Sequence, residues 1–242
     1  MRILLKIIRW AIGFFFGSTI LAVIIYRYMP VYVTPLMVIR SIEHISDGKS
    51  VIWHHHWIPL EEMSRHLPVA AMAGEDLKYL SHHGFNFESI KGAIKKNAAN
   101  GKIQRGGSTI SQQTAKNVFL WPSRTWVRKG FEAYFTVLIE LFWSKQRIME
   151  VYLNSIEMGD GIYGVDAVAE YHFGKKAIDL TRSECALIVA TLPNPRLYNS
   201  MIPSAYTRRQ QRKIEREMKF IPSFPKEGEA IDPHTAKGTY YK

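Results

Sequence analysis

Two adjacent carboxylates, Glu75 and Asp76, stand in the middle of an apolar stretch whose spacing is typical of a helix. If residues 68–83 form one helix, the face around Glu75 carries the residues at three- and four-residue steps, namely Ala71, Met72, Tyr79 and His82. Partial burial there would raise the pKa of Glu75 and make its carboxylate a usable general base. The alternative is an exposed Glu75 that pairs with Lys78, three residues further along.

A second polar group runs from Gly106 to Asn117. Its Thr109 and Gln112 form a capping box, which predicts a helix N-terminus whose free amides attract phosphate. Lys116 falls on the same helix face, with Gln113 beside it, so this group would line a groove with hydrogen-bond donors and a cation. A well-capped helix that merely follows a solvated loop is the alternative.

A third group places Arg128 and Lys129 four and three residues before Glu132, where a strongly apolar segment begins. This spacing supports a structural ion pair on a helix, and it equally suits a catalytic carboxylate, so both interpretations stay open. Three further polar residues near a helix end could either bind a substrate or pack and cap the helix: Lys145, Tyr152 and Asn154.

The run His54–His56 raises the question of a metal site. Consecutive side chains do not converge on one ion in a strand or a helix, and no matching histidine or carboxylate spacing accompanies them, so no metal site is predicted. The single cysteine, Cys185, excludes an internal disulfide and a thiolate cluster built by one chain. It lies in an apolar segment, where an inert core thiol is expected.

Composition limits the class of protein. A chain of 242 residues, 47% of them hydrophobic, can bury one good-sized core. The 32 lysines and arginines against 21 acidic residues give a formal charge of +11, which predicts attraction to polyanions. Nucleic acid, anionic lipid and a phosphorylated substrate all fit that charge.

The N-terminus narrows the choice. Trp10–Tyr26 carries no charge, and with its apolar neighbours it reaches about 20 residues, enough to cross a bilayer. Basic residues at positions 2, 6 and 9 favour a cytoplasmic N-terminus, against a weaker bias from Arg27. A cleaved signal peptide is the alternative, but the small-x-small cleavage pair is missing. We therefore expect an uncleaved single-pass anchor in the cytoplasmic membrane, an extracytoplasmic catalytic domain, and no nucleic-acid partner.

Helical signals dominate the rest of the chain. Residues 30–66 show no sustained helical period, and we expect a stalk there with at most a short strand. The basic connection Lys95–Gly107 suits a mobile lid. Helices are predicted from near Pro68, after Ser108, over 127–143, 145–154 and 164–172, from the capping box Thr181–Glu184 to Pro193, and over the basic segment 206–219. The remaining tail is expected to be loose.

In their order and spacing, these motifs resemble the peptidoglycan glycosyltransferases over roughly residues 60–200. The family's E-D-x-x-F-x-x-H-x-G motif matches Glu75, Asp76, Tyr79, His82 and Gly84, with tyrosine in place of phenylalanine. The pattern G-x-S-T-x-x-Q-Q-x-x-K-N is intact from Gly106 to Asn117. R-K-x-x-E matches Arg128, Lys129 and Glu132, and the later K, Y and N match Lys145, Tyr152 and Asn154. A hydroxyl on a buried Tyr79 would need a partner.

The resemblance implies a mainly α fold, with a lysozyme-like two-lobed helical domain behind an N-terminal transmembrane helix. Four parts are expected: a cytoplasmic N-terminus and anchor at 1–29, a stalk at 30–66, the glycosyltransferase domain at 67–204, and a basic helix with a loose tail at 205–242. No transpeptidase domain follows these motifs, so the monofunctional form of the enzyme is expected.

The resemblance also implies a reaction, in which glycan strands are polymerised from lipid II. The growing glycan is transferred, with inversion, from its undecaprenyl pyrophosphate carrier to the sugar 4-hydroxyl of an incoming lipid II, which is the acceptor. Glu75 would be the general base, and Glu132 would assist the leaving group. The expected substrate-binding residues are Asp76, His82, Ser108, Thr109, Gln112, Gln113, Lys116, Asn117, Arg128, Lys129, Lys145, Tyr152 and Asn154. Their cations would stabilise the departing pyrophosphate. No cofactor is expected, although a divalent cation could assist.

Two other functions stay open. A lysozyme-like glycan-cleaving enzyme also uses a glutamate on a helix, but it needs neither a pyrophosphate cradle nor an anchor. A non-catalytic membrane scaffold would instead bind other cell-wall synthesis or division proteins. For the polymerising enzyme, the expected partners are lipid II, the growing glycan strand and membrane lipids.

Overall fold

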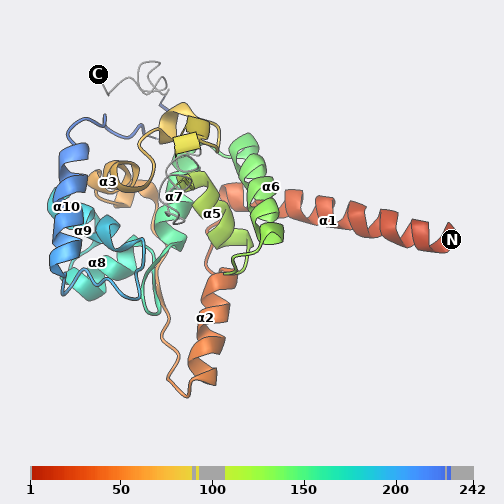
Figure 1. Ribbon diagram of the computed structural model, residues 1–242, viewed down its shortest axis with the longest axis horizontal. Coiled ribbons are helices and arrows are strands. Elements are labelled where there is room, and N and C mark those ends of the chain that lie inside the picture. The colour runs from red at the N-terminus through yellow and green to blue at the C-terminus, as the bar shows by residue number, and fades with distance from the viewer. Residues whose placement is uncertain (1, 89–90, 93–106, 227, 230–242) are drawn as a thin grey trace.

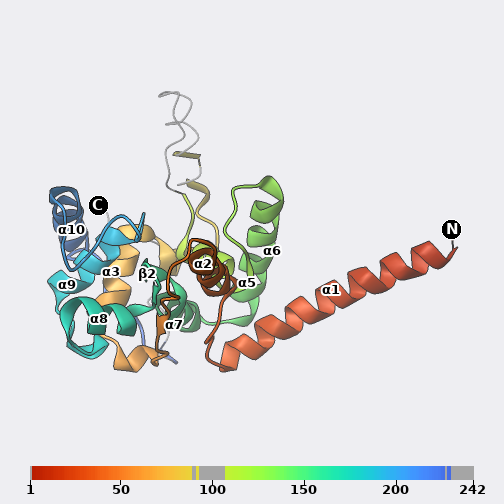
Figure 2. The same ribbon diagram turned by 90° about the horizontal axis from the view of Figure 1, so that it is seen from below.

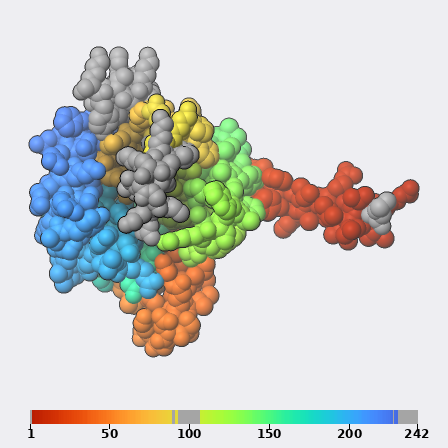
Figure 3. All heavy atoms as spheres, in the orientation of Figure 1, coloured from red at the N-terminus to blue at the C-terminus, as the bar shows by residue number. Residues whose placement is uncertain are grey.

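The long apolar run at the N-terminus forms one helix, α1 (Arg2–Tyr28), whose 27 residues are enough to cross a membrane. In the computed structural model, which describes residues 2–88, 91–92, 107–226 and 228–229, the N-terminal part of α1 stands clear of the body (Figures 1 and 3). Its C-terminal part is fixed to the body, because the Trp143 indole Nε1 donates to the carbonyl of Val23 at 2.7 Å. The expected apolar helix is therefore confirmed.

The segment expected to be a stalk contains a helix, α2 (Pro35–Ser46), so the expectation of no helix between residues 30 and 66 is wrong. Thr34 caps α2 by accepting a hydrogen bond from the Met37 amide at 3.3 Å, and Pro35 occupies its first turn. Met37 and His44 are buried, and α2 packs beside α5 (Ile110–Phe119). The Thr-Pro pair was a start signal for this helix in the sequence.

Helix α3 (His66–Glu75) ends where the first carboxylate pair begins, so the prediction of one helix over 68–83 is wrong beyond Glu75. The chain leaves the helix at Asp76 and makes only a short turn of 3₁₀ helix, η2 (Tyr79–Ser81). Tyr79 and His82 therefore do not continue the helix face of Glu75. Gly84 has a φ of +86°, and a Cβ there would lie 2.7 Å from the Cγ2 of Thr136, so the turn requires glycine.

The middle of the chain forms three helices, and the sequence predicts all of them. They are α5, α6 (Trp126–Phe142) and α7 (Lys145–Ser155), and α5 packs against both of the others. Thr109, Thr125 and Ser144 cap their N-termini. The capping box predicted at Thr109 is present. The predicted lid, Lys95–Gly107, lies outside the described residues except for Gly107.

The C-terminal helices form a second group with α3. They are α8 (Val165–Phe173), α9 (Arg182–Thr191) and the predicted basic helix α10 (Ala205–Glu217). Helix α9 lies against both α3 and α10, and a Cβ on Gly74 would come within 2.4 Å of the Val189 Cγ1. Cys185 is fully buried in α9. Figures 1 and 2 both show this group on one side of the molecule and α5 and α6 on the other.

Short strands and 3₁₀ turns join the two groups. They are β1 (His54–His55), β2 (Glu157–Gly159), β3 (Ile162–Tyr163), η1 (Leu60–Glu62) and η3 (Ala177–Asp179). The strand order is β1-β3-β2, with β1 parallel and β2 antiparallel to β3. A short strand was expected in the 30–66 segment, and β1 confirms it. The His54 ring packs on Tyr171, with ring centroids 3.8 Å apart, and the His55 Nε2 lies 3.0 Å from the Asn154 carbonyl oxygen.

The side chain of Asn154 clamps the chain that follows β1. Its Oδ1 accepts from the Ile58 amide at 3.1 Å, and its Nδ2 donates to the carbonyls of Ile58 and Glu150, both at 2.9 Å. Asn154 is fully buried. Its side-chain oxygen and nitrogen therefore bond to backbone groups of the protein itself.

We expect Asn154→Ala to lower the free energy of unfolding by about 2–3 kcal/mol, because three buried hydrogen bonds at about 1 kcal/mol each are lost. Chemical denaturation in detergent would measure this. Ser155→Ala is the matched control, since the buried Ser155 Oγ has no hydrogen-bond partner among the described residues and its removal should cost less than about 1 kcal/mol. Equal losses in both variants would contradict the clamp.

Candidate active site

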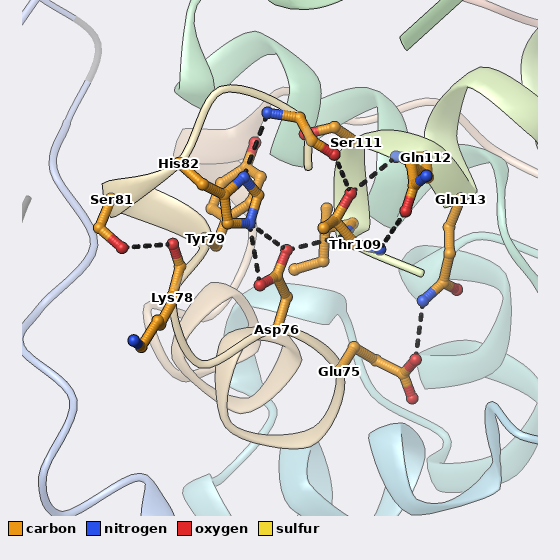
Figure 4. A network of polar contacts seen from close by, with 12 residues as sticks. Glu75, Asp76, Lys78, Tyr79, Ser81, His82, Thr109, Ser111, Gln112 and Gln113 are labelled. Carbon is orange, nitrogen blue, oxygen red and sulfur yellow. Dashed lines mark hydrogen bonds and ion pairs between the residues drawn. The ribbon is translucent and has the colours of Figure 1, made fainter. Parts of the chain in front are cut away.

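Glu75 lies at the last position of α3, half-buried, with its carboxylate directed toward α5 (Figure 4). Its Oε2 accepts a hydrogen bond from the Gln113 Nε2 at 2.8 Å. Burial raises the pKa of Glu75 and the charge of Asp76 adds to this, whereas the Gln113 hydrogen bond and the charge of Lys116 oppose it. Lys78 pairs with Glu88 instead, so the alternative of an exposed Glu75–Lys78 pair is wrong.

Gln113 is held in a defined orientation by a second contact. Its Oε1 accepts from the hydroxyl of the fully buried Tyr152 at 3.5 Å, which leaves the amide nitrogen to face Glu75. Two residues that the sequence places in the site, Gln113 and Tyr152, thus support the carboxylate in series. Tyr152 itself lies behind Gln113.

Asp76 connects the end of α3 to the beginning of α5 (Figure 4). Its carboxylate accepts from the Ile110 amide at 3.1 Å, where the positive end of the α5 dipole favours a negative charge. The His82 Nε2 lies 2.9 and 3.0 Å from the two carboxylate oxygens. The Gly84 amide donates to the His82 Nδ1 at 3.1 Å, so Nε2 carries the proton and donates to Asp76.

The capping box of α5 completes this network. Thr109 and Gln112 are buried and bond to each other, and the Thr109 hydroxyl also donates to the Gly84 carbonyl at 2.6 Å. Ser108, one residue earlier, is exposed and accepts from the Lys129 Nζ at 3.4 Å. Thr109 and Gln112 therefore position the loop, and Ser108 remains accessible.

Glu132 is 3% exposed and is held by both predicted cations. The Arg128 Nη1 lies 2.6 Å from its Oε2, and the Lys129 Nζ contacts its Oε1. The structural ion pair expected as one alternative is thus present. The buried Nε of Arg128 has no hydrogen-bond partner among the described residues.

The charges of both predicted catalytic carboxylates, Glu75 and Glu132, act on Lys116. Burial lowers its pKa; the charges of Glu132 and Glu75 favour the protonated form, and those of Arg128 and Lys129 disfavour it. Each of these groups is therefore close enough to act on Lys116, and α3, α5 and α6 bring them to one region. In the sequence, Glu75 lies 41 residues before Lys116, and Glu132 lies 16 residues after it.

A cavity of about 390 Å³ adjoins these cations. Lys116, Asn117 and Arg128 line it, and so does Arg124 in the loop between α5 and α6. Sequence reasoning missed Arg124. The signal that could have found it is its position four residues before Arg128, in a short polar connection between two cationic motifs.

Lys145 lies apart from the cation cluster, which consists of Lys116, Arg124 and Arg128 at the cavity. Its ammonium pairs with Glu140 at 2.8 Å and stands over the Tyr79 ring, 4.6 Å from the centroid. Burial lowers the pKa of Lys145, and the charge of Glu140 opposes this. The hydroxyl of the buried Tyr79 donates to the Lys145 carbonyl at 2.8 Å, which supplies the partner that the sequence called for.

We expect Asp76→Asn to lower the free energy of unfolding by about 1–3 kcal/mol, because it removes a charge from the α5 N-terminus and one acceptor from His82. Thermal unfolding would measure the loss. His83→Ala, at the exposed neighbouring histidine, serves as the control and should change stability by less than about 0.5 kcal/mol. A stable Asp76→Asn protein would show that the network does not hold the loop.

The chain is similar in sequence to proteins of one family. A sequence model of the family described as Transglycosylase matches residues 44–219. The relatives include proteins that carry the name biosynthetic peptidoglycan transglycosylase. The protein from Bacteroides thetaiotaomicron is 58% identical, over 94% of this chain and 93% of its own. Those from Caulobacter vibrioides and Bdellovibrio bacteriovorus are 51% and 47% identical, over 82% and 91% of this chain and 83% and 87% of their own. The chain therefore belongs to the transglycosylase family, among the monofunctional biosynthetic peptidoglycan transglycosylases.

Proposed function

We propose that this enzyme polymerises glycan strands by transferring a glycan from a polyprenyl diphosphate to the sugar 4-hydroxyl of an incoming lipid II, with inversion at the anomeric carbon. The observation that carries this proposal is the half-buried carboxylate of Glu75 beside the Lys116 ammonium, next to a cavity lined by arginines. A base and an anion-binding cluster on either side of one reaction centre suit an inverting displacement.

Glu75 acts as the general base in this proposal. Its raised pKa brings the carboxylate closer to the pH at which it must accept a proton, which favours proton transfer from a sugar hydroxyl. Gln113 fixes the orientation of the carboxylate through the 2.8 Å hydrogen bond. The hydroxyl oxygen attacks the anomeric carbon as Glu75 removes its proton, and the diphosphate departs with the bonding electrons.

The cations stabilise the departing diphosphate. Lys116, Arg124 and Arg128 line the cavity, where partial exclusion of water strengthens their interaction with anions. Both oxygens of Glu132 are occupied by cations, so we assign it to orienting Arg128 and Lys129 rather than to proton transfer. Asn117 lines the same cavity and Ser108 accepts a hydrogen bond from Lys129, and both are proposed to contact the donor.

The helix α1 is proposed to anchor the enzyme in the cytoplasmic membrane. The basic residues that precede the apolar run favour a cytoplasmic N-terminus, which places the catalytic domain on the other side. This side is where a lipid-linked donor and a growing glycan strand would meet the site.

Glu75→Gln should fold normally and lose at least 10²-fold to 10⁴-fold in kcat on lipid II, because the amide accepts no proton. Gel analysis of the glycan product from purified enzyme would measure it. Glu62→Gln, at an exposed carboxylate in η1, is the matched control and should keep full activity. Full polymerisation by Glu75→Gln would remove this residue from its role. Shortened strands from finished peptidoglycan would instead indicate glycan cleavage.

The pH profile of kcat/KM should rise with the ionisation of Glu75, at a higher pH than for a glutamate with the ordinary pKa, because burial raises the pKa of Glu75. Gln113→Ala removes a hydrogen bond that lowers this pKa, so its acidic limb should move to higher pH. Gln146→Ala removes a buried amide that bonds to the Lys226 carbonyl and should leave the limb in place. A Gln113→Ala limb that stays in place or moves to lower pH would contradict the assignment.

A further inference from the structure

The cavity beside the cation cluster has a second wall, which the proposed mechanism does not use. Helix α2 contributes Leu36 and Arg40 to this wall, and β2 contributes Glu157. Figure 2 shows α2 beside α5. The cavity thus lies between the first helix after the membrane anchor and the helices that carry the cation cluster.

Arg40 is engaged by two carboxylates in this structure. Its Nε and Nη2 lie 3.2 and 3.4 Å from the two oxygens of Glu157, and its Nη1 lies 2.7 Å from the Oε2 of Glu43. The Arg40 side chain is 20% exposed and Glu157 only 10%. A guanidinium that binds a carboxylate in this two-pronged way presents the same geometry that a phosphate requires.

The charges that line the cavity are unbalanced. Arg40 adds to Lys116, Arg124 and Arg128 on the positive side, and Glu157 is the carboxylate that opposes them among the described lining residues. Behind the lining, Glu43 and Glu132 pair with Arg40 and Arg128, so four cations face three carboxylates. This surplus of positive charge fits a ligand with two adjacent anionic groups. The apolar side chains of Leu36, Leu120 and Trp121 on the same walls fit the hydrocarbon that such a ligand would carry.

We propose that Arg40 is a further binding residue for the diphosphate of the lipid-linked donor, and that Glu157 is its counter-anion. This inference rests on the proposed function and adds the α2 wall to it. When the cavity is empty, Glu157 pairs with the Nε and Nη2 of Arg40, and Glu43 pairs with its Nη1. When the diphosphate enters, its phosphoryl oxygens compete with Glu157 for the guanidinium.

This competition predicts opposite effects for the two partners. Arg40→Ala removes a cation and should raise the Kd of a short prenyl diphosphate about tenfold, with a matching rise in the KM for lipid II. Glu157→Gln removes the competing charge, so it should lower the Kd or leave it unchanged. Calorimetric titration with geranylgeranyl diphosphate gives both values without requiring polymerisation.

Arg196→Ala is the matched control. Arg196 lies 3.7 Å from Glu43, which also pairs with Arg40, and 3.2 Å from Asp160, but it is not among the lining residues of the cavity. Its removal should leave the Kd of the prenyl diphosphate unchanged. Thermal unfolding of all three variants separates lost binding from lost structure, and Arg40→Lys should restore part of the affinity.

Weaker binding by folded Arg40→Ala, together with equal or tighter binding by Glu157→Gln, supports the proposal. Unchanged binding by Arg40→Ala overturns it. So does weaker binding by Glu157→Gln, because the pair would then only brace α2 against β2. A wild-type enzyme that binds the diphosphate yet makes no polymer from lipid II would contradict the proposed function and leave the assignment of Arg40 standing.

Discussion

The site depends on one carboxylate, that of Asp76, which follows the last residue of α3 and accepts a hydrogen bond from the first amide of α5. By accepting from the Ile110 amide and pairing with His82, it stops the helix immediately after Glu75. Glu75 is thereby fixed relative to Gln113 and Lys116, both of which stand on α5.

Several charged side chains near this junction are largely removed from water. Glu132 is 3% exposed and pairs with Arg128 and Lys129, and the half-buried Lys116 is acted on by the charges of Glu75 and Glu132. Buried charges of this kind contribute little to stability after desolvation, so their value lies in the field that they present to a ligand. An incoming anion meets cations that are already oriented, which reduces the cost of rearrangement during the reaction.

The sequence predicted α5, α6, α7 and α10 because their caps and apolar spacing are local signals. It overextended the helix at Glu75 because helical spacing continues past Asp76, whereas the interaction that ends the helix comes from Ile110, 34 residues away. It passed over α2, although Thr34 and Pro35 marked its start. Motif membership also says nothing of whether a residue faces the substrate or, like Asn154, holds the backbone. The pairing of Arg40 with Glu157 spans 117 residues and has no local signature.

The union of α1 with the body has a mechanical consequence. The Trp143 indole and the Arg147 guanidinium bind carbonyl groups near the end of α1, and the Thr19 hydroxyl lies 2.8 Å from that of Tyr134. The C-terminal part of α1 is therefore fixed to the body and does not act as a flexible linker. Because Thr19 lies inside the Trp10–Tyr26 segment expected to cross a bilayer, an α1 that spans the membrane would hold the adjoining surface of α6 at the level of the lipid and would fix the tilt of the whole body.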